Sequence, residues 1–243
     1  LDTALAAAVR LNGDLTVIDI ASNDESGAST TYSKTATGAS NVMLTASDST
    51  WSVETGALAT DLGNNIKYAG ALTVTGIANG NETAALTAYT ETKTGATINT
   101  LTATDNNWSV TKENLDTALA AMVRFAGDLT VSSIIAEKAA IYGYTSTLTG
   151  ATTITLTAAD TNWLIDADEL TESLADGVRL AGALTVEKVE AGNETAALAE
   201  YTNTLTGATN VTLTASDNNW SVVAATLDTA LAAAVRLNGD LTV

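Results

Sequence analysis

The sequence predicts an α+β tandem-repeat protein, a solenoid-like stack of units about 57 residues long, each with several short β-strands and one amphipathic helix. Three observations support this fold class. The tryptophans recur at intervals of 57, 55 and 57 residues, at Trp51, Trp108, Trp163 and Trp220. Leu-Thr-Val triplets keep the same spacing and end at Val17, Val74, Val131, Val186 and Val243. Residues 1–17 are identical to residues 227–243, and such self-similarity at a fixed period is typical of repeat architectures.

This period divides the chain into one partial and four full repeats. The partial repeat, with one helix and one strand, is residues 1–17, and the full repeats are residues 18–74, 75–131, 132–186 and 187–243. A single unit has too little apolar surface to fold alone, so we expect its stability to come from stacking on its neighbours. Both ends of the chain lie inside a unit, so we expect these residues to be part of a longer array. They contain no basic and apolar leader pattern and no apolar stretch of about 18 residues, so we expect neither a signal peptide nor a membrane span among them.

The last repeat illustrates the elements that we expect in each unit. Asn193–Tyr201 is predicted to be a helix with Asn193 as its N-cap. The segments Thr202–Thr206 and Thr209–Thr214 contain six threonines and favour two strands, joined by a type II′ hairpin at Gly207. In the alternative interpretation, the first helix continues to a C-cap at that glycine.

A second helix is predicted from about Ala224 to Leu237, because apolar Leu227, Leu231 and Val235 are spaced at i, i+4 and i+8. In the third repeat, Asp166 and Glu169 predict a capping box at the start of this helix. The glycines that follow the helices are assigned to C′ positions: Gly13, Gly70, Gly127, Gly182 and Gly239. One basic residue is expected in each last turn, where the helix dipole stabilises a cation: Arg10, Lys67, Arg124, Arg179 and Arg236.

An Asp-x-x-Trp segment precedes this helix in every repeat. Its aspartate is expected to bond the backbone of its own turn, and its tryptophan is expected to fill the core as a structural residue, with carbohydrate stacking as the alternative. The same aspartates are the candidate calcium ligands: Asp48, Asp105, Asp160 and Asp217. Ca²⁺ takes roughly six to eight oxygen ligands, and the polar segments 22–25 and 79–82 could supply more. Neither an EF-hand loop nor a glycine-rich nonapeptide is present.

Composition excludes several classes of function. The net charge of −18 disfavours nucleic acid and anionic membrane surfaces as partners, since binding either depends on Lys and Arg. The absence of His and Cys removes Ser-His-Asp and Cys-His nucleophiles and the usual zinc sites. Most acids recur once per unit, so we expect no catalytic residues, no cofactor and no enzymatic activity. The absence of proline is consistent with a long backbone ladder.

The Thr-, Ala-, Asp- and Asn-rich, proline-free repeats resemble the large secreted bacterial tandem-repeat proteins that build adhesin stalks, surface layers or extracellular fibres. This resemblance implies an extracellular or cell-surface location and a structural role without catalysis. We therefore expect a filament or surface array formed by head-to-tail self-association. The alternative is a repeat-scaffold binding module, an adhesin that binds Ca²⁺, glycan or ice, the last through Thr-Leu-Thr rows such as Thr155–Thr157.

Overall fold

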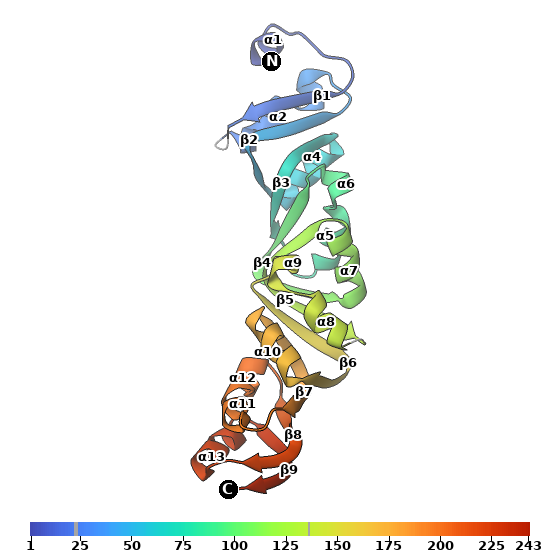
Figure 1. Ribbon diagram of the computed structural model, residues 1–243. Helices are drawn as coiled ribbons and strands as arrows, with labels where there is room; N and C mark the ends of the chain where they lie inside the picture. Colours follow the sequence, from blue (N-terminus) through green and yellow to red (C-terminus); the bar gives the residue numbers. More distant parts are fainter. Residues whose placement is uncertain (22–23, 136) are drawn as a thin grey trace. The chain divides into compact units, whose positions relative to one another are not determined.

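The computed structural model describes most of the chain: residues 1–21, 24–135 and 137–243. These residues form two compact units. The first comprises Leu1–Trp108 and Glu113–Gly127, and the second comprises Ser109–Lys112 and Asp128–Val243. In each unit, strands alternate with short helices along the chain (Figure 1).

The first unit contains the elements from α1 to β4. Its strands are β1 (Leu15–Ile20), β2 (Val42–Glu54), β3 (Ile66–Ile77) and β4 (Ile98–Thr111). Its helices are α1 (Asp2–Ala6), α2 (Glu25–Thr31), α3 (Lys34–Thr37), α4 (Thr55–Gly63), α5 (Glu82–Ala88), α6 (Glu91–Thr94) and most of α7 (Lys112–Ala120). Helix α4 packs on β2 and β3.

The second unit repeats this plan. Its strands are β5 (Val123–Ile134), β6 (Thr153–Asp166), β7 (Val178–Val189), β8 (Asn210–Ser221) and β9 (Val235–Thr242). Its helices are α8 (Glu137–Gly143), α9 (Ser146–Thr149), α10 (Ala167–Ala175), α11 (Glu194–Glu200), α12 (Asn203–Thr206) and α13 (Ala224–Ala232). Helix α10 packs on β6 and β7, and α13 packs on β9. Strands β4 and β5 and helix α7 contribute residues to both units.

Within each unit, consecutive strands pair in parallel. The pairs are β1–β2, β2–β3 and β3–β4 in the first unit and β5–β6, β6–β7, β7–β8 and β8–β9 in the second. Parallel neighbours need a crossover between them, and the short helices lie in these crossovers (Figure 1). The predicted α+β class is confirmed, and the order of strands and helices is compatible with a solenoid-like stack.

The strands bend at a glycine that faces an aspartate turn. Val42–Thr45 pairs with Ile66–Ala69, but the pairing resumes at Thr50 opposite Ala71. Gly70, at φ +101°, is the residue that β3 places across this bend, and a Cβ on it would lie 2.2 Å from the carbonyl oxygen of Ser49. Only glycine fits such an approach. The same contact recurs further along the chain, at Gly127 with Asn106, Gly182 with Thr161 and Gly239 with Asn218.

The predicted C′ role of these glycines is therefore wrong. Helix α13 ends at Ala232, and Val235, assigned to the helical apolar stripe, begins β9. Ala234 adopts a left-handed φ of 60° between them, which stops the helix. Pairing of Val235 with Val211 in β8 outweighs the helix propensity of this alanine-rich segment. Gly13 likewise lies well after the end of α1 at Ala6.

The predicted hairpin at Gly207 is also wrong, and the alternative helical C-cap is closer to the structure. Asn203–Thr206 is helix α12, and Gly207 is its left-handed C-cap, with a φ of 81°. The Thr202 hydroxyl accepts a hydrogen bond from the Leu205 N–H at 3.4 Å, so threonine acts here as a cap and not as a strand residue. The helix predicted after Asn193 forms as α11, although the Asn193 side chain makes no capping bond. The strand predicted at Thr209–Thr214 forms as the first part of β8, which begins at Asn210.

None of the basic residues lies in the last helical turn: four lie in strands and Arg10 lies between α1 and β1, but three of them still reach the helix end. Arg124, Arg179 and Arg236 donate from Nη1 to the carbonyl oxygens of Leu119, Leu174 and Leu231, at 3.4, 3.2 and 3.2 Å. The cation therefore meets the negative end of the helix dipole from the following strand. Lys67 instead donates to the Thr92 carbonyl at 2.7 Å, and Arg10 donates to the Val9 carbonyl. The capping box predicted at Asp166 and Glu169 is confirmed.

Each tryptophan is buried in the core at a strand bend. In each repeat the indole Nε1 donates to the carbonyl oxygen of the residue directly before the bend glycine, at 2.9–3.0 Å. The acceptors are Ala69, Ala126, Ala181 and Asn238. Trp51 and Trp108 also meet Tyr68 and Phe125 edge to face. Burial of such a ring contributes up to about 4–6 kcal/mol. Each tryptophan therefore stabilises the bend that the glycine makes sterically possible.

Candidate functional site

The four candidate calcium aspartates lie in separate exposed turns. In each turn, the aspartate Oδ1 accepts a hydrogen bond from the backbone N–H two residues later, at 3.0 Å. These aspartates stand in β2, β4, β6 and β8 and do not converge: Asp48, Asp105, Asp160 and Asp217. This is the Asx turn expected from the sequence, and it uses one carboxylate oxygen for the backbone.

The other predicted oxygen ligands are placed differently. Asn79 donates from Nδ2 to Asp105 Oδ2 at 2.8 Å, whereas Ser22 and Asn23 lie outside the described residues. Over the part of the chain that the structure describes, no three acidic side chains are grouped to hold a metal ion. Calcium binding stays a prediction. Of the Thr-Leu-Thr segments, residues 147–149 and 204–206 are helical, so they cannot extend a row of strand threonines.

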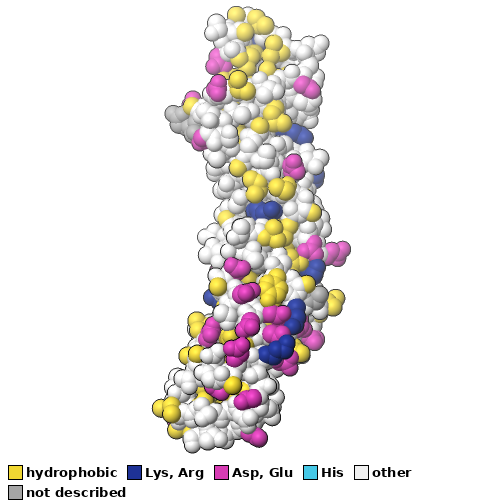
Figure 2. All heavy atoms as spheres, in the orientation of Figure 1, with side chains coloured by type: hydrophobic (Ala, Val, Ile, Leu, Met, Phe, Trp, Pro, Cys, Tyr) yellow, Lys and Arg dark blue, Asp and Glu magenta, His cyan; other side chains and the backbone are white. Residues whose placement is uncertain are grey.

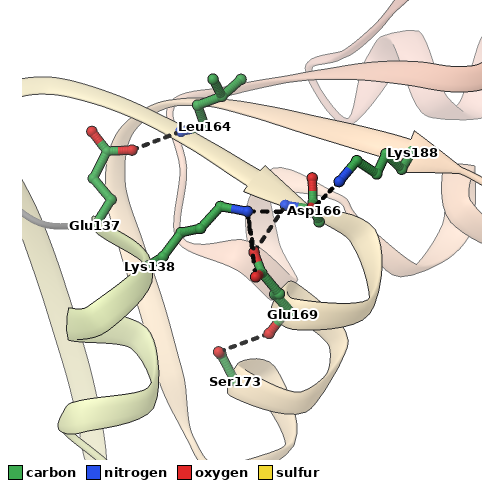
Figure 3. Close-up of polar contacts among 7 residues, drawn as sticks. All are labelled: Glu137, Lys138, Leu164, Asp166, Glu169, Ser173 and Lys188. Atoms are coloured by element: carbon green, nitrogen blue, oxygen red, sulfur yellow. Dashed lines mark hydrogen bonds and ion pairs between the residues drawn. The ribbon is translucent and has the colours of Figure 1, made fainter.

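A charged cluster in the second unit breaks the repeat pattern (Figure 3). Asp166, at the start of α10, lies 3.1 Å from Lys138 Nζ and 2.7 Å from Lys188 Nζ. Lys138 also lies 3.1 Å from Glu169 Oε2. The hydrogen bonds from Lys188 and then Lys138 hold the pKa of Asp166 below its usual range, and the bonds to Glu169 and Asp166 raise the pKa of Lys138.

Two further bonds tie this cluster to its neighbours. Glu137 Oε2 accepts from the backbone N–H of Leu164 in β6 at 2.9 Å, and Ser173 Oγ donates to the Glu169 carbonyl at 2.9 Å (Figure 3). The carboxylates of Asp166 and Glu169 are therefore paired with lysines. A general acid would need a raised pKa near the working pH, and Asp166 has a lowered one, so the cluster is suited to joining α8, α10 and β7.

The sequence indicates only part of this cluster. Asp166 and Glu169 are recognisable as a capping box, but Lys138 and Lys188 stand 28 residues before and 22 residues after Asp166. The signal that could have found them is the break in the repeat. Positions equivalent to Asp166 hold Glu54, Thr111 and Val223. Figure 2 shows acidic and basic side chains gathered over this part of the second unit.

A shallow groove recurs beside α2, α5 and α11. Its volumes are about 510, 260 and 290 Å³. Equivalent residues of the repeat line each copy: Ile20, Ala28 and Tyr32; Ile77, Ala85 and Tyr89; Val189, Ala197 and Tyr201. The groove is therefore a product of the repeat itself.

The copy beside α11 is more polar than the copy beside α5. The Tyr201 hydroxyl donates to the Ala167 carbonyl at 3.0 Å and lies 2.7 Å from Thr171 Oγ1, and burial raises the pKa of this phenol. Glu190 and Glu200 line this groove, where the copy beside α5 has Ala78 and Ala88. Small-residue positions in one copy thus carry carboxylates in another.

The last strand exposes residues that are buried elsewhere. Leu241 in β9 is 46% exposed, whereas the equivalent leucines are each 1% exposed: Leu72, Leu129 and Leu184. Val243 is 65% exposed, and its buried equivalents are Val74, Val131 and Val186. In the interior, the following strand covers these side chains.

Among the described residues, no helix has the length and apolar character needed to cross a lipid bilayer. No protein-family model, curated protein or solved structure matches this chain.

Proposed function

We propose that the chain is a non-catalytic structural protein that forms an extracellular fibre, filament or surface array. In this proposal, each unit of about 57 residues supplies two bent strands with their helices and stacks on the next unit. The recurring contacts support it, because the tryptophan bond and the bend glycine return at the same positions of each repeat. The acidic surface would keep such an array soluble.

The observation that carries the proposal is the repeated burial at the junctions between strands, where the equivalent leucines Leu72, Leu129 and Leu184 are each 1% exposed. Burying one leucine side chain contributes about 1.5–3 kcal/mol, and an unpaired strand edge is a template for another strand. A second copy of the chain can supply that strand. Head-to-tail contacts of this kind are heterologous and extend without closing, which is the behaviour of a filament.

Sedimentation velocity over a series of concentrations, followed by negative-stain microscopy, tests this function. We expect the average mass to grow with concentration and rods or filaments to appear. The variant Leu184→Ala controls for general loss of stability, because it creates a cavity in the core but leaves the β9 edge unchanged. A monodisperse monomer at every concentration would refute the structural role.

A second candidate is a repeat-scaffold binding module, and the recurring groove favours it. The three copies differ in charge, so a ligand that recognises them would distinguish the acidic copy beside α11 from the apolar copy beside α5. Calorimetry with Ca²⁺, a glycan array and an ice-recrystallisation assay test this function, with Tyr89→Ala and Tyr201→Ala as groove variants. Absence of binding in all three assays would remove this candidate.

A further inference from the structure

We infer that Asn79 is a self-modification site, at which the chain converts this asparagine to aspartate or isoaspartate by its own chemistry. Asn79 and Gly80 lie in the exposed crossover between β3 and α5. In this reaction the Gly80 backbone nitrogen attacks Asn79 Cγ and closes a five-membered succinimide ring. Glycine favours the closure, because it has no Cβ to obstruct the approach and adopts a wide range of backbone angles. The reaction is independent of the proposed fibre or binding role.

Glu82 is placed to act as the general base. Its Oε2 accepts the Gly80 N–H at 2.7 Å, and this N–H carries the proton that the attacking nitrogen must lose. A base in direct contact with such a proton accelerates its transfer in the transition state. Gly80 has a φ of +88°, and a Cβ at this residue would meet nothing within 4 Å, so the peptide has room to move as the ring closes.

Two residues of β4 hold the side-chain amide of Asn79. Thr104 Oγ1 donates to Asn79 Oδ1 at 3.2 Å, and Asn79 Nδ2 donates to Asp105 Oδ2 at 2.8 Å. The Thr104 hydroxyl lies where negative charge develops on Oδ1 in the tetrahedral intermediate, and such a donor stabilises that charge. The two bonds also restrict the amide to one orientation, which lowers the entropy that ring closure costs.

The bonds and protons of this reaction balance with water as the only external reagent. Glu82 takes the proton from the Gly80 nitrogen, the bond from this nitrogen to Asn79 Cγ forms, and the Cγ–Nδ2 bond breaks. The departing nitrogen receives the proton that Glu82 took, passed on through solvent, and leaves as ammonia. Water then opens the succinimide at one of its two carbonyl groups and gives aspartate or isoaspartate. Asn79 and Gly80 are exposed, so water reaches the ring.

The fourth repeat has the same crossover without the reactive amide. There the Gly192 N–H donates to Glu194 Oε2 at 2.9 Å, so the contact between glycine and glutamate belongs to the crossover in both repeats. Ser216 and Asp217 provide the hydroxyl and the carboxylate at the equivalent positions of β8, but Ala191 replaces the asparagine. The second repeat therefore adds a reacting side chain to a loop that the fourth repeat also forms.

Conversion would change the contact between the crossover and β4. The new carboxylate replaces the Nδ2 donor, so an oxygen would face Asp105 Oδ2 where a hydrogen bond existed, and two carboxylates that share a site repel each other. Isoaspartate also adds one carbon to the main chain. We therefore expect the modified crossover to separate from β4 and its amide hydrogens to exchange faster.

Incubation at neutral pH, followed by peptide mapping and mass spectrometry, measures the conversion rate at each Asn-Gly dipeptide. Asn12-Gly13 and Asn238-Gly239 lie in other repeats and serve as internal references in the same sample. The folded chain should convert Asn79 at least about tenfold faster than the chain unfolded in urea, because the base and the hydroxyl are in place only in the fold. An equal or slower rate in the folded chain would overturn the inference.

Variants of the contacts test the assigned roles. Glu82→Gln keeps an acceptor for the Gly80 N–H but removes the base, so it should slow conversion about tenfold or more. Thr104→Val removes the hydroxyl donor and should slow it by a smaller factor. Circular dichroism and unchanged rates at the reference dipeptides check that each variant is folded. If Glu82→Gln instead accelerates conversion, the bond protects Asn79 and the inference is wrong.

The fourth repeat provides the reciprocal test. Ala191→Asn places a side-chain amide before Gly192, beside the base Glu194, and should create a second site that converts about as fast as Asn79. A rate at residue 191 no higher than the rate at Asn238 would show that the base and the hydroxyl do not accelerate the reaction.

Discussion

The phenol of Tyr68 donates a hydrogen bond to the carboxylate of Asp61, and both side chains are buried in the first unit. The pair joins the end of α4 to the start of β3. In the following repeat, Ala118 and Phe125 occupy these positions, and Phe125 is buried against Trp108 as Tyr68 is against Trp51. One repeat therefore has a hydrogen-bonded polar pair at the two positions where the next repeat has apolar side chains.

We predict that Tyr68→Phe destabilises the first unit by about 2–3 kcal/mol, because it leaves a buried carboxylate without its donor. The double variant Asp61→Ala/Tyr68→Phe reproduces the Ala118 and Phe125 pair and should cost less than about 1 kcal/mol. Urea denaturation followed by tryptophan fluorescence measures both. A double variant as unstable as the single one would contradict this explanation.

The same pair predicts a loss of stability in alkali. Burial, followed by the bond to Asp61, raises the pKa of Tyr68 above its ordinary value of 10.0. The unfolded chain therefore loses this proton at a lower pH than the folded chain does. The stabilisation is complete below pH 10.0 and falls as the pH rises above it. Thermal melts between pH 8 and pH 11, about the range that brackets a free phenol, should show a smaller alkaline decline in Tyr68→Phe than in the wild type.

The period of the sequence predicts the fold class because each repeated residue makes one repeated contact. Trp163 bonds the Ala181 carbonyl, and Gly182 admits the Thr161 carbonyl, so substitution of either would disturb a bend. The path of the chain between these landmarks is less predictable. Ala234 ends α13 by adopting a left-handed φ, and alanine has no sequence signature for that conformation.

The same limit applies to the threonine-rich segments and to the charged cluster. Thr202 and Thr206 have strand propensity, but here the Thr202 hydroxyl caps one helical turn and the Thr206 hydroxyl bonds back to its carbonyl, so both stabilise that turn. Sequence alone does not decide between these uses. Lys188 reaches Asp166 because β6 and β7 pair in one register, and Lys138 reaches it from α8, which packs on β6. Neither arrangement can be predicted from residues that occur in one repeat only.

Asn99 is a buried polar residue with an unsatisfied donor. Its Oδ1 accepts from Thr94 Oγ1 at 2.9 Å, whereas its Nδ2 has no partner among the described residues. Val42, Ile154 and Val211 occupy the equivalent positions. We predict that Asn99→Val stabilises the first unit by about 1–2 kcal/mol, since a buried unpaired amide is removed and the Thr94 hydroxyl retains the Thr90 carbonyl. The reverse change, Val42→Asn, should destabilise the same unit in the same urea titration.

The salt-bridge cluster should contribute little to stability. Lys138 and Lys188 are exposed, and exposed ion pairs contribute about 0–1 kcal/mol. We predict that Asp166→Asn lowers the stability of the second unit by less than about 1 kcal/mol at neutral pH. Because the pKa of Asp166 is lowered, its contribution is present above the unfolded pKa and is lost as the pH falls through the folded pKa. Acid titrations in low and high salt should therefore differ in the wild type and converge in the variant.

Alanine substitutions at Gly182 and Gly192 distinguish the cost of a steric clash from the cost of backbone strain. Both have positive φ, at +112° and +92°, but a Cβ on Gly182 would lie 2.2 Å from the Thr161 carbonyl oxygen, whereas a Cβ on Gly192 meets nothing within 4 Å. Gly192→Ala should therefore cost about 1–2 kcal/mol, the strain of a left-handed residue. Gly182→Ala adds a clash with backbone and must move the β6 bend, so we expect a larger loss, with weaker protection of the Trp163 indole from hydrogen exchange. Equal losses at the two glycines would show that the bend can relax, and that its glycine is needed for conformation and not for close approach.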